Sequence, residues 1–101
     1  MDESNAALEV RIVPEAHARL EQLLTDLQHF GAKTRRQQLL IATAAALKTL
    51  SAFPYAGKAV RGQPRIRELR LTPPYILLYT VTSRPSVEIL DILDSRLDHP
   101  D

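Results

Sequence analysis

The chain has 101 residues, which is enough for one domain with one modest core. Thirteen Lys and Arg residues against twelve Asp and Glu residues leave a net charge of +1, so the molecule as a whole is not a basic nucleic-acid coat. The absence of cysteine excludes disulfides, thiol nucleophiles and cysteine-ligated zinc sites.

The two ends of the chain are polar, and we expect flexible tails at 1–7 and 98–101 around a single domain at 8–97. The first residues lack the cationic and then apolar pattern of a signal peptide. The longest apolar stretch, 39–47, is too short to span a bilayer. The sequence therefore predicts a soluble, cytoplasmic protein.

The first third of the chain predicts a short strand and a helix. Residues 8–12 alternate apolar and polar side chains, as in a strand. Pro14 suits the first turn of a helix over 14–30, and Gly31 suits the left-handed residue that ends one. The apolar stripe of this helix is formed by Ala16, Leu20, Leu23, Leu24, Leu27 and Phe30.

A second helix is predicted over 33–52, and it must end before Pro54 because proline does not fit a helix interior. Thr34 and Gln37 have the spacing of a capping box. Small residues, Ala42 and 44–46, let another element come close to this helix. The short connection at Gly31 makes the two helices an antiparallel hairpin.

The remaining chain predicts a turn-rich loop at 53–64 and then three strands, at 65–71, 75–81 and 86–93. The order β-α-α-β-β-β gives an α+β fold with the helical hairpin on one face of a mainly antiparallel, four-stranded sheet. The expected core comprises Ile12, Leu20, Leu24, Leu27, Leu40, Leu47, Leu50, Leu78 and Ile89.

Charge is concentrated between Lys58 and Arg70, where five basic residues stand against the single acid Glu68. Such a segment is either a solvated face, with Glu68 paired to Arg70 or Arg61, or a surface that meets phosphate or an acidic protein. On a strand, Arg65 and Arg67 share a face with Leu69 and Leu71, an arrangement that a bulge or a late strand start would resolve. Arginine fits phosphate or carboxylate with two parallel hydrogen bonds.

Other chemistry finds little support in the sequence. His17, His29 and His99 are far apart and lack metal-ligand spacing, so we expect no metal site and no cofactor. No glycine-rich loop resembles a phosphate cradle before a helix. The carboxylates Asp91 and Asp94 are interpreted as solubilising groups.

Four segments together resemble the RelE/ParE superfamily of toxins from bacterial type II toxin–antitoxin modules, often labelled plasmid stabilisation proteins. These segments are VRIVPEAHARLEQLL, FPYAG, IRELRLTPPYILLYTV and VEILDILDSR. By position, Pro54 and Gly57 match a Pro-x-x-Gly loop. The other matches are Arg67 and Leu69 in an Arg-x-Leu strand, Tyr75 and Tyr79 in a tyrosine-rich strand, and Arg96 as the closing arginine.

One departure from the family pattern bears on activity: Asp94 stands where the family often has histidine. The chain also has no tyrosine after Tyr79. The resemblance therefore implies the ParE branch, a growth inhibitor that binds a protein target such as DNA gyrase and is neutralised by a cognate antitoxin. The expected assembly is a homodimer or a toxin–antitoxin hetero-oligomer.

Two alternatives remain open. One is a RelE-like, ribosome-dependent mRNA endoribonuclease, with Arg67, Arg70, Glu68 and His99 in the catalytic roles; the other is a degenerate toxin or plain binding domain. For a toxin, we expect that replacing Arg67 or Arg70 by alanine relieves growth arrest without unfolding the chain. The predicted binding face consists of Arg61, Arg65, Arg67, Arg70, Tyr75 and Arg96.

Overall fold

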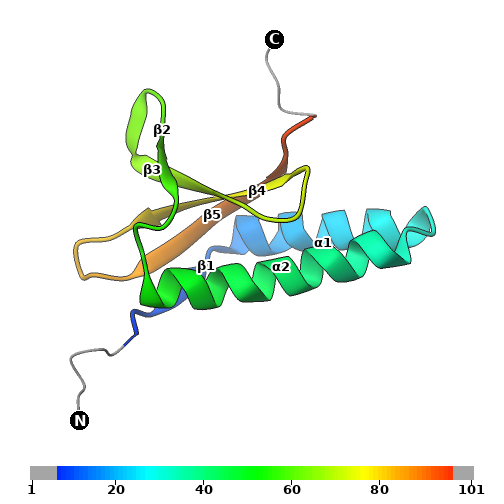
Figure 1. The fold of residues 1–101 in the computed structure, drawn as a ribbon, viewed down its shortest axis with the longest axis horizontal. Helices are drawn as coiled ribbons and strands as arrows, with labels where there is room; N and C mark the ends of the chain where they lie inside the picture. The colour runs from blue at the N-terminus through cyan, green and yellow to red at the C-terminus, as the bar shows by residue number, and fades with distance from the viewer. Residues whose placement is uncertain (1–6, 97–101) are drawn as a thin grey trace.

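The computed structural model describes residues 7–96 as two helices packed on one five-stranded sheet (Figure 1). The expected tails lie outside the described residues, apart from Ala7. In chain order the elements are β1 (Val10–Ile12), α1 (Pro14–His29), α2 (Lys33–Ala52), β2 (Lys58–Val60), β3 (Gln63–Arg70), β4 (Tyr75–Val81) and β5 (Val87–Asp94).

The strands lie in the order β1-β5-β4-β3-β2. All neighbouring pairs are antiparallel except β1 and β5, which run parallel with Val10 opposite Val87. The α+β fold class is therefore confirmed, with five strands in place of the four expected. The additional strand, β2, has only three residues in a segment whose prolines and glycines indicate turns, so the sequence pattern does not reveal it.

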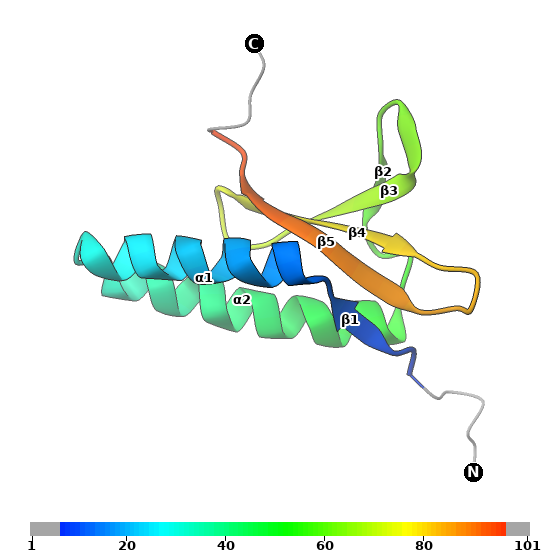
Figure 2. The same ribbon diagram turned by 180° about the vertical axis from the view of Figure 1, so that it is seen from behind.

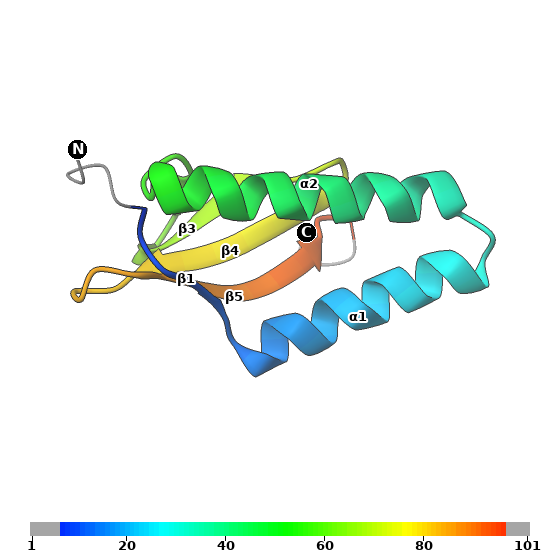
Figure 3. The ribbon, with the colours of Figure 1, turned by 90° about the horizontal axis from the view of Figure 1, so that it is seen from below.

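The helical hairpin covers one face of the sheet (Figure 2). Seen from the helical side, α2 crosses β3 and β4, while α1 lies beside β5 (Figure 3). Gly31 has φ 73°, so it supplies the left-handed residue after α1 as expected. The N–H groups of Gly31 and Ala32 donate to the carbonyls of Gln28 and Leu27, which ends α1 in a Schellman motif.

The expectation of a capping box at the start of α2 is wrong. Ala32 is the N-cap residue and has no side-chain capping bond, while Thr34 already lies inside the helix. A capping hydroxyl must precede the first helical residue to reach the free N–H groups, so Thr34 stands too late in the chain.

The core lies between the helices and the inner face of β4 and β5. Leu77, Tyr79 and Ile89 pack there against Ala16 and Leu50. Of the nine expected core residues, Leu50 and Ile89 are fully buried. The six that are partly buried are Ile12, Leu20, Leu24, Leu27, Leu47 and Leu78.

Two apolar residues were misplaced by the helical pattern. Leu40 is 38% exposed, and its neighbour Leu39 is fully buried in its place. One residue turns a helix by about 100°, so a small error in phase exchanges the two positions. Phe30 is 80% exposed and is the C-cap residue, one position after the end of α1 at His29.

Within the described range, neither helix has the length and apolar content needed to cross a membrane.

Candidate functional site

The Pro-x-x-Gly loop between α2 and β2 is held by a buried tyrosine. The N–H of Gly57 donates to the Tyr79 hydroxyl at 2.8 Å, and the Tyr79 side chain is fully buried. This bond satisfies both a buried phenol and a buried backbone donor, which are costly when left unpaired. The match of Gly57 and Tyr79 to family positions therefore corresponds to a direct contact between them.

Arg67 holds the same loop from β3. Its Nε and Nη2 atoms donate to the Gly57 carbonyl at 3.0 and 2.7 Å, and Nη2 also lies 3.5 Å from the Tyr55 carbonyl. The guanidinium carbon lies 5.2 Å from the centre of the Tyr55 ring, within range of a cation–π interaction. Arg67 is therefore a partly buried, hydrogen-bonded side chain and not a freely exposed arginine.

We expect Arg67→Ala to lower the free energy of unfolding by about 1–3 kcal/mol, because it leaves the Gly57 carbonyl without its charged donor. Arg65→Ala is the matched control, since Arg65 is exposed and the change should stay within about 0.5 kcal/mol. Urea denaturation of both variants measures the difference. Equal stability of the two variants would contradict a structural role for Arg67.

Glu68 lies on the opposite face of β3 from Arg67, since successive side chains of a strand alternate. Its carboxylate pairs with Lys58, with Nζ 3.8 Å from Oε2, and not with Arg70 or Arg61, the partners considered for a solvated face. The reason is the missed strand: Lys58 of β2 stands directly opposite Glu68 in the β2–β3 register. Side chains directly opposite on antiparallel strands are close neighbours.

At the other end of the sheet, Asp94 binds Arg96. One Asp94 oxygen accepts from the Arg96 backbone N–H at 2.9 Å and from Nε at 3.2 Å, and the other accepts from Nη2 at 3.0 Å. Asp94 is only 7% exposed. The side-chain hydrogen bonds from Arg96 hold the pKa of Asp94 below its usual range, although burial opposes the shift. Asp94 is thus a binding partner of Arg96 and not merely a solubilising carboxylate.

The pKa of Asp94 is lower in the folded state than its value of about 4 in the unfolded chain. Ionised Asp94 therefore stabilises the fold fully when the pH is above the unfolded pKa. This stabilisation is lost as the pH falls through the folded pKa. We expect Asp94→Asn to cost about 1–3 kcal/mol at neutral pH and to weaken the loss of stability below about pH 4. Asp26→Asn, at an exposed position of α1, is the control for the charge change. Denaturation midpoints measured across the acid range test the prediction. An unchanged pH dependence in Asp94→Asn would contradict it.

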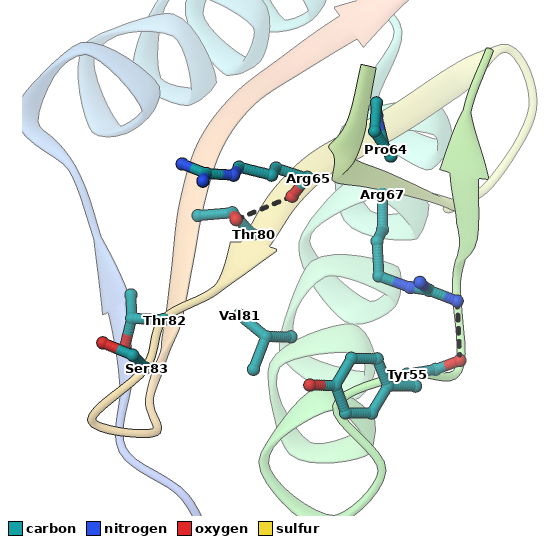
Figure 4. A pocket seen from close by; sticks show the side chains of 8 residues that line it. All are labelled: Tyr55, Pro64, Arg65, Arg67, Thr80, Val81, Thr82 and Ser83. Atoms are coloured by element: carbon teal, nitrogen blue, oxygen red, sulfur yellow. Dashed lines mark hydrogen bonds between the residues drawn. The ribbon is translucent and has the colours of Figure 1, made fainter. Parts of the chain in front are cut away.

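The predicted binding face does not form one surface. Arg61 lies in the turn between β2 and β3, whereas Arg70 lies at the far end of β3 beside Ser95. Tyr75 is only 5% exposed and packs in the core. The guanidinium of Arg96 is bound to Asp94. Arg65 and Arg67 line one cavity together (Figure 4), and Arg70 and Tyr75 line a different one.

A groove of about 380 Å³ lies between α2 and the end of β3. Its helical wall is made of small residues, including Ala42, Ala45 and Thr49, while Leu69 and Arg70 lie across from them. Ile41, which is 67% exposed, continues the apolar surface along α2. The alanines that predicted the close approach of another element therefore border an open groove.

Residues 10–98 match the family model described as the ParE toxin of the type II toxin–antitoxin system parDE. The chain belongs to the ParE toxin family. The superfamily indicated by the sequence motifs, and its ParE branch, are thereby confirmed.

The fold of this family member is also found in a solved structure. A chain titled "Chromosomal ParDE TA system from P. aeruginosa" has a TM-score of 0.69 and 16% sequence identity, over 86% of this chain and 95% of that one. At this identity the likeness establishes the fold alone. No curated protein gives a significant sequence match.

Proposed function

We propose that this type II toxin inhibits growth by binding a protein target such as DNA gyrase, and that a cognate antitoxin neutralises it. The observation that carries the proposal is the engagement of Arg67 with the Gly57 carbonyl, on the face of β3 opposite Glu68. Acid–base catalysis needs its groups within reach of one reacting atom. Arg67 and Glu68 point away from each other, and His99 lies outside the described residues.

The groove between α2 and β3 is the proposed antitoxin site. Its alanines allow close approach of a backbone, its leucines offer apolar contact, and Arg70 adds positive charge at its border. These features suit an acidic, amphipathic segment that folds as it binds. A bound antitoxin stabilises the folded toxin by mass action, so the co-purified complex should unfold at a higher temperature than the toxin alone.

Expression in bacteria tests the proposed target. Induction of the chain should arrest growth, and co-expression of the neighbouring antitoxin gene should restore it. Purified toxin should inhibit supercoiling of plasmid DNA by gyrase while cellular mRNA stays intact.

Other outcomes identify the alternatives. Cleaved mRNA with normal supercoiling would assign the chain to the RelE-like endoribonucleases. Normal growth after induction, with the folded protein present, would indicate a degenerate toxin. Arg70→Ala is the informative variant for toxicity because Arg70 is exposed, so loss of toxicity would not follow from unfolding.

A further inference from the structure

The cavity lined by Arg65 and Arg67 forms because β3 leaves β4. The two strands are paired only from Arg67 to Arg70, whereas the start of β3, at Gln63, pairs with Val60 of β2. At the point of divergence, the Thr80 hydroxyl donates to the Arg65 carbonyl at 2.7 Å. The divergence opens a cleft of about 540 Å³, a volume typical of sites for small ligands.

The cleft is positively charged. Arg65 is exposed and makes no ion pair within residues 7–96. Arg67 contacts neutral carbonyls there, so no carboxylate offsets its charge in that part of the chain. Arg84, also exposed, follows the lining residue Ser83 in the β4–β5 turn. No Asp or Glu occurs among the described residues that line the cleft. Uncompensated guanidinium groups around a cavity favour an anionic ligand.

One wall of the cleft is formed by an aromatic side chain, Tyr55. Tyr55 lies across from Thr82 and Ser83 in Figure 4, with Arg67 above it. The residue Tyr55 is 65% exposed although the Arg67 guanidinium lies over its ring. Its remaining surface can receive a flat group, and the Ser83 hydroxyl across the cleft adds a hydrogen-bonding group.

We infer that this cleft binds single-stranded nucleic acid, with a phosphate held by Arg65 and a base stacked on Tyr55. Arginine binds phosphate through paired N–H donors, and aromatic rings hold bases without regard to sequence. An acidic peptide would use the arginines but would leave the exposed ring without a stacking partner. The inference concerns binding and is independent of whether the toxin acts on gyrase.

The test is fluorescence anisotropy with the full chain and a short, labelled single-stranded oligonucleotide, as RNA and as DNA. Tyr55→Ala should weaken binding about fivefold or more. Arg65→Gln should weaken it and reduce the slope of log affinity against log salt by about 0.7. Tyr55→Phe keeps the ring and should bind as the wild type does. If Tyr55→Ala unfolds, Tyr55→Leu removes the flat ring and provides the same comparison.

Lys48→Gln is the matched control, because it removes one exposed charge from α2, away from the cleft. It should keep the affinity and the salt slope of the wild type. The inference is overturned if the wild type shows no saturable binding, or if Lys48→Gln weakens binding as much as Arg65→Gln. It is also overturned if a poly-glutamate peptide binds more tightly than the oligonucleotide and loses affinity only with Arg65→Gln, which would identify an acidic protein segment as the ligand.

Discussion

Gly57→Ala is expected to lower the free energy of unfolding by about 3 kcal/mol or more, with a fall in melting temperature of about 12 °C or more. A Cβ atom at position 57 would collide with the Glu68 carbonyl and lie 2.8 and 2.9 Å from the Tyr79 hydroxyl and Cε1. The backbone at Glu68 is paired with strands on both sides, so it cannot move aside easily. The collision also displaces the N–H that donates to Tyr79.

Gly62→Ala is the control, since it adds the same methyl group in the adjacent hairpin. No atom of residues 7–96 lies within 4 Å of the added Cβ there, but the φ of +80° strains a residue that has a side chain. This strain should cost about 1–2 kcal/mol. Thermal and urea unfolding of both variants measure the difference. If Gly57→Ala is no less stable than Gly62→Ala, the tight packing of the loop against Tyr79 is contradicted.

Ala45→Glu is expected to weaken antitoxin binding about 100-fold or more while leaving the toxin itself folded and active. Ala45 lines the groove between α2 and β3 and is exposed, so the toxin alone should change in stability by less than about 0.5 kcal/mol. In the complex, a glutamate there would fill the groove and place an unpaired negative charge against an acidic segment. An uncompensated buried charge costs about 3–5 kcal/mol.

Growth during co-expression with the antitoxin and calorimetric titration of the two proteins test this prediction. Cells that carry Ala45→Glu should remain arrested although antitoxin is present. Ala18→Glu makes the same change at an exposed position of α1, outside the groove, and should still be neutralised. Equal rescue of both variants would remove the groove from the antitoxin interface.

The long, periodic elements were predictable from the sequence. The bounds of α2 and β4 agree with expectation, and α1 differs by one residue, because apolar spacing and the positions of Pro14, Gly31 and Pro54 mark their ends. The strand β2 was missed because three residues are too few for a pattern. The strand β2 forms by pairing with β3, and the sequence of residues 58–60 alone does not show that partner.

The roles of the arginines were harder to predict. The alternation of side chains along β3 correctly places Arg67 on the same face as Leu69. It does not reveal that the carbonyls of the 53–57 loop, and not a helix, lie against Arg67. The cleft was missed for a related reason. It depends on where β3 leaves β4 and on the position of Tyr55, which is distant in the chain from Thr80 and Ser83.

The parallel pairing of β1 with β5 determines when the domain can be completed during synthesis. Val10, Arg11 and Ile12 align with Val87, Glu88 and Ile89, and Arg11 and Glu88 form an ion pair across the two strands at 3.3 Å. The ribosome makes β1 first among these strands and β5 last, so β1 has no strand partner until β5 has been synthesised. The sheet of this toxin can therefore be completed only after its last strand, β5, has been made.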